Sequence, residues 1–467
     1  MNGDLPNPLP RGRLRRAAPL AGLAARTAGA AAAARLRGGG DADAVARHAR
    51  AAERYAELLG GSKGALMKAG QMLSFVSLGP LIAPDVQSAY RAALARLRAD
   101  APPMAPDFAQ AVLEAELGGA ADTAFAAFDF EPLAAASLGQ VHPARLRDGR
   151  RVAVKLQYPG VREAVAADLR NAELLAVLVD LVTSFAPRRM RRVDGRAVAS
   201  GIGARIRDEL DYRVEARHQA QFAARYRGHP FIRVPAVIGE LCGERMLTQE
   251  LVEGLPWEEA IAAGSELRDG WGEAIHRFAY GAANRGELFH ADPHPGNYAF
   301  HEDGSVSVLD FGCVARLRPQ TAQANRVIVS ACLAGDAGAT WRASVEAGLW
   351  SAVDPVTQEE IQAFWHAPFQ LYWAPQPFAL PADYMTAWMQ RRYSPSGPSG
   401  NAVRHLAAPD EYVILGRMDV GVMSLLAGLR ATCDWRAILA ESVEGAAPRT
   451  PMGRREHEFF GTRPFAA

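Results

Sequence analysis

The sequence HADPHPGN occupies residues 290–297, and VLDFG follows at residues 308–312. The first stretch places two histidines, one aspartate and one asparagine within eight positions. The second is an apolar run that ends in an acid and a glycine. Three interpretations are open for the pair: a metal site, a phosphoryl-transfer site, or a turn with incidental polar residues.

A helical metal site would need His290 and His294, four residues apart, on one face of a continuous helix. Pro293 and Pro295 exclude such a helix, because proline lacks the backbone donor and clashes with the preceding turn. A simple turn would require no later partner, yet the VLDFG segment follows closely as a predicted buried strand. The coupling of the two segments therefore favours phosphoryl transfer.

Phosphoryl transfer from a nucleotide needs a carboxylate beside the attacking oxygen, oxygen ligands for Mg²⁺, and a cation on the phosphates. The chain supplies these groups as Asp292, Asn297, Asp310 and Lys155. In protein kinases the asparagine lies five residues after the catalytic-loop aspartate, and the metal-binding aspartate stands in a DFG sequence. Asn297 lies five residues after Asp292, so the spacing predicts a kinase-like site.

The candidate lysine lies in RRVAVKLQYP, residues 150–159. Apolar and small or polar residues alternate there, which predicts a strand with Val152, Val154 and Leu156 on its core face and Lys155 on the other. The local sequence VAVK is close to the VAIK strand that presents the phosphate-binding lysine in kinases. Together with the two segments above, this gives three ordered elements of one kind of site.

The lysine needs an acidic partner, and ELDYRVEA at residues 209–216 offers three acids. If this segment is helical, Asp211 and Glu215 are four apart and face one way, whereas Glu209 diverges from Asp211. A solvated acidic face with a pair between Glu209 and Arg213 is the simpler alternative for an isolated segment. The position between the lysine strand and the catalytic loop favours a functional role.

The loop that would cover the phosphates departs from the ordinary kinase pattern. A glycine-rich GxGxxG is expected upstream of the lysine, where it lets backbone amides approach phosphate. The chain instead has LAAASLGQVH at residues 133–142, a segment that in isolation suggests a helix start or a linker. Alanine methyls at residues 134–136 stiffen the turn, and we therefore expect an altered preference between ATP and ADP.

Composition excludes several classes of function. The 467 residues contain 52 Lys and Arg against 51 Asp and Glu, so a net charge of +1 provides no basic field for nucleic acid. Four widely separated cysteines argue against a structural zinc site or a disulfide framework, and they fit a reducing cytoplasm. Charged residues, Asp180, Arg417 and Asp419, interrupt the longest apolar stretches, so the sequence predicts no transmembrane segment.

Shifts in composition predict the organisation of the chain. Residues 373–400, rich in Pro, Tyr, Ser and Gly, are predicted to form a long loop. The predicted parts are a basic Ala- and Arg-rich leader (1–45), an N-terminal helical extension (46–125), an N-lobe with a helical insert (126–252), a helical C-lobe (253–447) and a tail (448–467).

Seven motifs together resemble the UbiB/AarF atypical kinase-like family, called ADCK in animals. They occur in the order of that family and cover about residues 55–320. The motifs are KAGQ (68–71), AAASLGQVH (134–142), VAVK (152–155), ELDYRVEA (209–216), MLTQELVEG (246–254), HADPHPGN (290–297) and LDFG (309–312).

The resemblance implies an α+β, two-lobed protein-kinase-like fold with an added N-terminal helical KxGQ element that restricts access to the cleft. It implies a pairing of Glu215 with Lys155, and a hinge over residues 246–254 that contacts adenine through its backbone. Its implied site residues are the KxGQ residues Lys68 and Gln71, the ExD acids Glu209 and Asp211, the nucleotide-contacting Ala134, Ala135, Ala136, Ser137, Glu250 and Leu251, the catalytic acid Asp292, and the magnesium ligands Asn297 and Asp310.

The family resemblance further implies ATPase activity in support of prenyl-quinone or other lipid metabolism, with protein kinase activity suppressed. The implied ligands are ATP or ADP with Mg²⁺, and the implied partners are a lipid or quinone-pathway ligand or a protein. We expect a bacterial protein of the cytoplasm or one peripheral at the inner face of the membrane. Gln249 replaces a methionine common in the family hinge, a change that would tune adenine binding.

Two alternatives belong to other functional classes. Small-molecule phosphotransferases of the aminoglycoside or choline kinase type have a catalytic loop, HGDxHxxN, close to HADPHPGN, but they lack the KxGQ and ExD motifs that this chain has. A nucleotide-binding scaffold without turnover is the second alternative, because the presence of catalytic residue types does not by itself establish catalysis.

Overall fold

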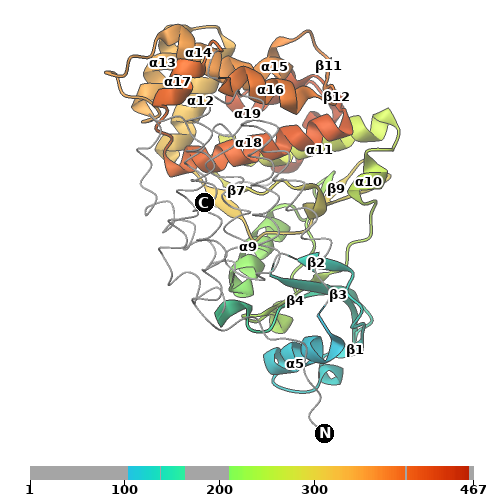
Figure 1. Ribbon diagram of the computed structural model, residues 1–467. Coiled ribbons are helices and arrows are strands. Elements are labelled where there is room, and N and C mark those ends of the chain that lie inside the picture. Colours follow the sequence, from blue (N-terminus) through green and yellow to red (C-terminus); the bar gives the residue numbers. More distant parts are fainter. Residues whose placement is uncertain (1–103, 137, 164–209, 395–396, 462–467) are drawn as a thin grey trace, which may run out of the picture. The chain divides into compact units, whose positions relative to one another are not determined.

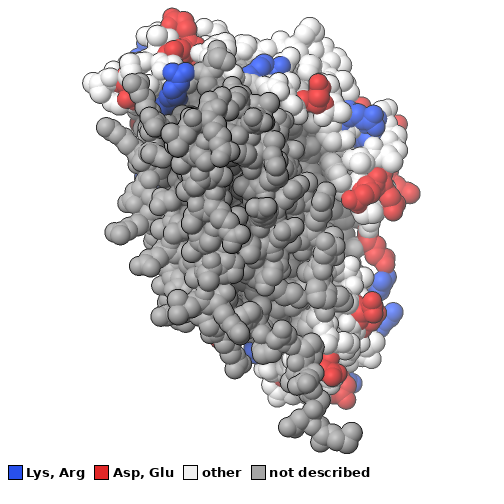
Figure 2. Space-filling view, viewed as in Figure 1, with Lys and Arg blue, Asp and Glu red and all other residues white. Residues whose placement is uncertain are grey.

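The computed structural model describes residues 104–136, 138–163, 210–394 and 397–461 (Figure 1). The chain divides into two compact units. The first comprises Met1–Val214 and Ile238–Glu250, and the second comprises Glu215–Val237 and Leu251–Ala467. On the face in Figure 2, basic and acidic side chains of the described residues are interspersed, in agreement with the small net charge.

The described part of the first unit is an antiparallel sheet with one helix. The strand order is β1-β3-β4-β6, and β2 pairs with β3 on the same sheet. The elements are α5 (Pro106–Leu117), η1 (Ala121–Thr123), β1 (Phe125–Phe128), β2 (Ala134–Ala136), β3 (Gly139–Leu146), β4 (Arg151–Gln157), η3 (Gly239–Leu241) and β6 (Met246–Glu250).

The core of this unit follows the predicted alternation along β4. Val152, Val154 and Leu156 are fully buried and share one apolar cluster with residues of α5, among them Leu113. The helix α5 is fixed further by Glu116, which accepts from the backbone and side chain of Arg245 beside β6. The helix therefore packs into the core of the sheet.

The second unit begins with most of α9 (Tyr212–Arg225) and is largely helical after β10. Its strands form small sheets: β5 (Ile232–Arg233), β9 (Val306–Val308) and β8 (Tyr298–Phe300) make a three-stranded sheet, and β7 (Leu288–His290) pairs with β10 (Val314–Arg316). The other elements up to β10 are α10 (Trp257–Ala260), α11 (Ser265–Asn284) and η4 (Pro295–Asn297).

After β10 the chain forms a set of packed helices. They are α12 (Pro319–Leu333), α13 (Ala337–Glu346), α14 (Gln358–His366), η5 (Ala367–Phe369), α15 (Gln370–Trp373), α16 (Tyr384–Tyr393), α17 (Gly400–His405), α18 (Asp410–Leu429), α19 (Trp435–Val443) and α20 (Pro451–Gly461), with β11 (Phe378–Ala379) paired to β12 (Thr432–Cys433). Helices α11 and α18 lie side by side (Figure 1). Three tryptophans, Trp271, Trp388 and Trp435, are completely buried in this core.

Two predicted irregular regions are instead structured. The predicted loop at residues 373–400 contains β11 and α16, because Tyr384 and Trp388 of α16 are buried in the core. The predicted tail at residues 448–467 contains α20. In the first segment the Pro, Ser and Gly content misled the prediction, although Tyr384, Met385, Trp388 and Met389 recur there at helical spacing.

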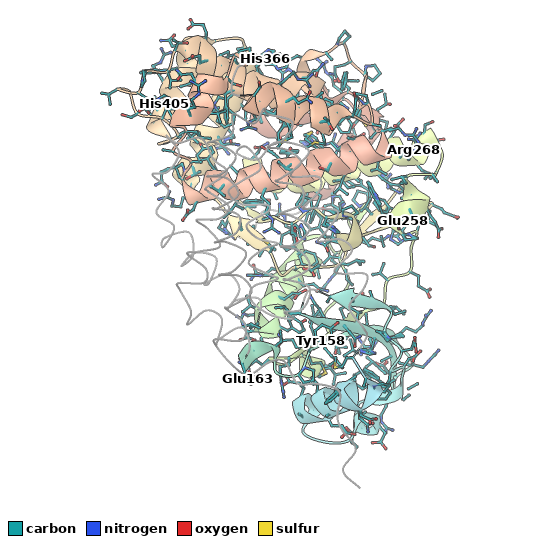
Figure 3. All side chains as sticks on the ribbon, viewed as in Figure 1. Tyr158, Glu163, Glu258, Arg268, His366 and His405 are labelled. Atoms are coloured by element: carbon teal, nitrogen blue, oxygen red, sulfur yellow. The ribbon has the colours of Figure 1, made fainter. Side chains whose placement is uncertain are left out.

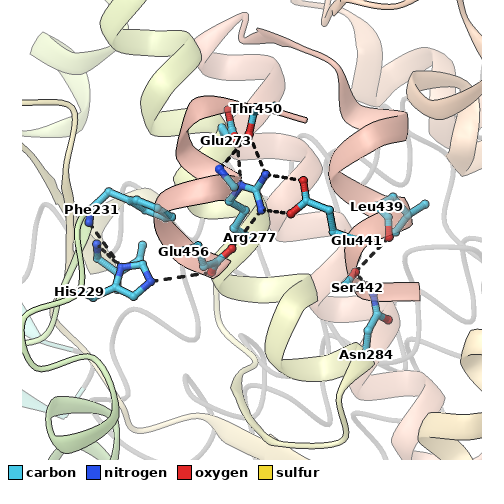
Figure 4. A network of polar contacts seen from close by, with 12 residues as sticks. His229, Phe231, Glu273, Arg277, Asn284, Leu439, Glu441, Ser442, Thr450 and Glu456 are labelled. Atoms are coloured by element: carbon cyan, nitrogen blue, oxygen red, sulfur yellow. Dashed lines mark hydrogen bonds and ion pairs between the residues drawn. The ribbon is translucent and has the colours of Figure 1, made fainter. Parts of the chain in front are cut away.

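A buried polar network anchors α20 (Figure 4). The guanidinium of Arg277 on α11 contacts Glu273, Glu441 and Glu456, with N–O distances of 2.6 to 3.0 Å. Only 3% of the Arg277 side chain is exposed. Thr450 donates to Glu273 and accepts from Arg277, so the segment before α20 belongs to the same network.

Among the described residues, α18 is the one helix long and apolar enough to cross a membrane by length and composition, and half of its apolar window is buried in the fold. The two charges that interrupt it have partners in the same unit. Arg417 pairs with Asp292, and the Tyr280 hydroxyl donates to Asp419. Arg268 of α11 also donates to the carbonyl of Leu429 at its end (Figure 3). These contacts join α18 to the rest of the unit.

Candidate functional site

The segment HADPHPGN leaves β7 at His290 and closes with the short helix η4. His290 is buried, and its Nε2 donates to the carbonyl oxygen of Asp310 at 2.6 Å. Burial lowers the pKa of His290, in agreement with a neutral ring that donates from Nε2. The Nδ1 of His294 accepts from the backbone N–H of Gly296. Both histidine side chains therefore form hydrogen bonds with the backbone. Among the described residues, no group of three or more His, Cys, Asp or Glu side chains is placed to hold a metal ion.

Asn297 and Asp310, the predicted magnesium ligands, flank a pair of strands: Asn297 ends η4 just before β8, and Asp310 follows β9, which pairs with β8. The Asn297 side-chain amide donates to the carbonyl of Asp292 at 2.9 Å, and its own carbonyl accepts from Leu309 N. Asp310 Oδ1 accepts from Gly312 N at 2.9 Å. An amide oxygen and a carboxylate are hard oxygen donors, which Mg²⁺ prefers together with water and phosphate oxygens. The donor set fits that ion.

Glu215 of α9 lies beside the LDFG segment. The kinase-like interpretation requires a glutamate at this place. The Glu215 residue is 5% exposed. A Cβ built on Gly312 would lie 3.3 Å from Asp310 Oδ1 and 3.6 Å from Glu215 Oε2, so both carboxylates border this glycine. The buried Phe311 ring packs on Phe222 of α9 with ring centroids 4.9 Å apart. The helix and the LDFG segment therefore form one packed body.

Lys155 extends from β4 as predicted, in register with Val141 of β3 and Leu247 of β6. Its ammonium lies 4.9 Å from the centroid of the Tyr212 ring, a cation–π distance. Tyr212 is almost fully buried at the start of α9. Sequence analysis did not single out this tyrosine, although an aromatic residue next to the acids of ELDYRVEA was the available signal.

The segment LAAASLGQVH forms a strand pair. Ala134, Ala135 and Ala136 make β2 and pair with Val141, Gln140 and Gly139 of β3. The interpretation of this segment as a helix start or linker in isolation is therefore wrong, because the antiparallel partner lies only a few residues ahead in sequence.

A glycine is needed at the start of β3. A Cβ on Gly139 would lie 2.0 Å from the carbonyl oxygen of Leu156, which no side chain could tolerate. Next to it, the backbone N–H of Tyr158 donates to the carbonyl of Leu138 and ties the end of β4 to the hairpin turn (Figure 3). Gly139 and this hydrogen bond therefore hold the β2–β3 hairpin against β4, the strand that carries Lys155.

The predicted hinge begins on β6. Thr248 is buried, Gln249 is partly buried and Glu250 is exposed at the end of the strand. Leu251 follows as a partly buried residue outside any regular element. The backbone therefore changes from paired to unpaired at Glu250, and the contact with adenine stays a prediction.

Asp211 precedes α9 and is not part of a helix that includes ELDYRVEA as a whole. Its Oδ1 accepts from the backbone N–H and the Nε of Arg213, and these bonds lower the pKa of Asp211. The helix therefore begins at Tyr212, later than a helix over the whole of ELDYRVEA would, because the Asp211 side chain accepts from a backbone N–H of its first turn. Arg213, the suggested partner of Glu209, contacts Asp211 and Glu244.

Four of the predicted site residues lie outside the described residues: Lys68, Gln71, Ser137 and Glu209. Their roles remain predictions.

Arg417 and Gly421 of α18 are contacts of the catalytic loop that sequence analysis missed as functional residues. The Arg417 guanidinium lies 2.7 Å from Asp292 Oδ1. A Cβ on Gly421 would lie 2.5 Å from Pro293 Cγ. The only available signal was the presence of an arginine in an otherwise apolar stretch, which had been interpreted solely as evidence against a membrane span.

The fold and this arrangement of groups define a kinase-like protein. The family model of the ABC1 atypical kinase-like domain matches residues 96–344, and the chain belongs to that family. This confirms the resemblance to the UbiB and ADCK proteins and the kinase-like fold class.

Individual relatives agree with this assignment. The "Uncharacterized protein Rv0647c" of Mycobacterium tuberculosis is 33% identical over 295 residues, covering 61% of this chain and 59% of the relative. The "Probable protein kinase UbiB" of Azotobacter vinelandii is 35% identical over 226 residues, covering 47% and 41%. The chain thus matches less than two thirds of the length of each.

A solved structure is also similar. It is the complex of Rv3197 with erythromycin from Mycobacterium tuberculosis, at a TM-score of 0.60 and 29% identity, and the match covers 78% of this chain and 88% of that one.

Proposed function

We propose that this protein is an unorthodox kinase-like ATPase that binds a magnesium nucleotide. The observation that supports the proposal most directly is that the carboxylates of Glu215 and Asp310 both border Gly312. The carbonyl of Asn297 also accepts from Leu309 N, next to Asp310. A buried carboxylate that lies beside a second carboxylate destabilises the fold unless a cation is held nearby. Lys155 and Mg²⁺ are the cations that this interpretation supplies.

Each group has a chemical role in the proposal. Lys155, paired with Glu215, orders the phosphates, and the backbone beside Ala134–Ala136 covers them, while Glu250 and Leu251 contact the adenine through backbone groups. Asn297 and Asp310 hold Mg²⁺, which neutralises charge on the phosphate oxygens.

Asp292 orients the attacking group. In hydrolysis the water oxygen bonds to the γ-phosphorus, the bond from that phosphorus to the bridging oxygen of ADP breaks with its electron pair on ADP, and the water proton passes to Asp292. An acceptor hydroxyl would take the place of water in a transfer reaction.

Access of bulky substrates to the site is restricted in the proposal by the KxGQ element, through Lys68 and Gln71, with Glu209 and Asp211 helping to hold it. In the structure Asp211 accepts hydrogen bonds from the backbone and side chain of Arg213 at the first turn of α9, and its contact with the KxGQ element is part of the proposal. We further propose that the activity supports prenyl-quinone or other lipid metabolism, as the names of relatives such as UbiB suggest.

The test is the shift in thermal unfolding with Mg-ATP and with Mg-ADP in wild type and Asp310→Asn. A ligand at one hundred times its dissociation constant stabilises the native state by about 2.7 kcal/mol. We expect a magnesium-dependent shift in wild type that the variant loses, since the amide removes the ligand charge. The sizes of the ATP and ADP shifts test the nucleotide preference.

Asp303→Asn is the matched control. Asp303 is an exposed carboxylate that, like Asp310, accepts from the backbone two residues ahead. Its variant should retain the full shift. No shift in wild type would contradict nucleotide binding, and a shift without ATP hydrolysis would favour the scaffold alternative. Phosphate transfer to choline or an aminoglycoside would favour the small-molecule phosphotransferase alternative.

A further inference from the structure

Helix α18 packs directly against the catalytic loop of the same unit. Gly421 lies so close to Pro293 that an added Cβ would be 2.5 Å from Pro293 Cγ and 2.6 Å from Pro293 O. Backbone of the loop therefore touches backbone of the helix, and only glycine allows it. The two segments lie about 130 residues apart in sequence.

One turn before Gly421 on the same helix face, Arg417 reaches the neighbouring loop residue. Its Nη2 donates to Oδ1 of Asp292 at 2.7 Å. The Arg417 side chain is 10% exposed and that of Asp292 is 32% exposed. The guanidinium is thus enclosed by the fold, whereas the carboxylate that it contacts remains accessible to solvent.

Because Arg417 and Gly421 are four residues apart, they project from one side of α18 toward consecutive loop residues. Gly421 allows α18 to pack closely against Pro293. At this distance the Arg417 side chain reaches Asp292. An enclosed guanidinium has few orientations available, so a carboxylate bonded to it is also restricted in rotation.

We propose that Arg417 is a positioning residue for Asp292: α18 holds the catalytic acid in its reactive orientation through this ion pair. The inference rests on the proposed function, in which Asp292 orients the attacking water or hydroxyl. It assigns part of the helical region after residue 320, for which no sequence motif was available, to control of the catalytic loop.

The test compares ATP turnover in wild type, Arg417→Met, Arg417→Lys and Arg417→Ala. Met keeps the length of the side chain without its charge, and Lys keeps the charge without the fixed fork of donors. We expect kcat to fall about 100-fold in Arg417→Met, the cost of a misplaced catalytic group, with KM for ATP changed less than about threefold. Arg417→Lys should be intermediate.

Chemical rescue separates positioning from a purely structural role. Guanidinium chloride at low millimolar concentration should restore part of the kcat of Arg417→Ala, with sodium chloride at equal ionic strength as the control. A helix that had merely lost stability would gain nothing from guanidinium. Equal turnover in Arg417→Met and wild type, or turnover faster than wild type, would overturn the proposal, and so would an absence of rescue in folded Arg417→Ala.

Two measurements keep this result distinct from failure of the proposed function. Every variant should retain the Mg-ADP-dependent shift in unfolding temperature, because Arg417 is assigned no contact with nucleotide. If wild type itself neither binds nucleotide nor hydrolyses ATP, the proposed function fails, and the failure appears without any variant. Arg436→Met is the matched control: Arg436 pairs with Glu444 at 2.8 Å on the surface, and its loss should leave kcat unchanged.

Discussion

Two arginines of the second unit contact carboxylates in contrasting ways. Arg277 is 3% exposed and contacts three carboxylates, each 11 to 15% exposed. Arg417 is also enclosed, but the carboxylate at which it points, Asp292, is 32% exposed and lies in the candidate catalytic loop. The first arrangement is closed on all sides and joins helices. The second arrangement joins an enclosed guanidinium to Asp292, a carboxylate that is accessible to solvent.

Burial of an arginine therefore does not by itself reveal its role. In a low-dielectric interior either guanidinium needs a nearby negative charge. What differs is the accessibility of the partner, since an accessible carboxylate can exchange contacts with water or an acceptor. Loss of Arg277 should therefore show mainly in stability, and loss of Arg417 mainly in turnover.

The largest stability effect is expected for Arg277→Met. The variant leaves Glu273, Glu441 and Glu456 without their shared cation, and loss of one partner of a buried ion pair costs about 3–5 kcal/mol. Urea unfolding measures the change. Turnover per folded molecule should fall less than in Arg417→Met. A stability loss below about 1 kcal/mol, the range of an exposed ion pair, would contradict the structural role assigned to Arg277.

Asp419, two residues after Arg417 on α18, gives an intermediate effect that depends on pH. Burial raises the pKa of Asp419 to about 6, and the Tyr280 hydroxyl and the charge of Arg392 oppose this shift in part. A raised carboxyl pKa means that the folded state binds the proton more tightly than the unfolded state. This contribution is complete below about pH 4 and is lost as pH rises through about 6.

We therefore expect Asp419→Asn to gain about 1–3 kcal/mol relative to wild type between those pH values, because its amide cannot ionise. Unfolding free energies of both proteins at pH 4, 5, 6 and 7 measure the difference. Buried His229 and His276, whose pKa values burial lowers to about 3, change stability in the opposite sense. Both proteins share them, so they cancel in the comparison. A difference independent of pH would contradict the prediction.

The smallest effect is expected for Arg436→Met. Its pair with Glu444 is exposed by 35% and 38%, and exposed pairs contribute about 0–1 kcal/mol. Added salt should remove most of whatever difference urea unfolding detects. A loss comparable to that of Arg277→Met would show that exposure is a poor guide to these arginines.

Sequence analysis predicted the local features of the candidate site well. The alternation around Lys155 gave a strand with the expected core face. VLDFG was predicted to begin as a buried strand that ends in the acid; the strand, β9, is buried but ends at Val308, two residues before Asp310. It was wrong about the extent of the helix near Asp211 and about the loop at residues 373–400. In both places the outcome depended on a few side-chain contacts that composition does not reveal.

The sequence by itself determined the family and the order of the motifs, because backbone periodicity and motif spacing act over short distances along the chain. The kind of chemistry that the motifs indicate stays a prediction. Only the tertiary structure decided that Glu215 borders Gly312, that α18 touches Pro293, and that Arg417 contacts Asp292. These contacts join residues about 100 or more positions apart. They depend on how helices pack, and packing is set by the whole core and not by any one segment.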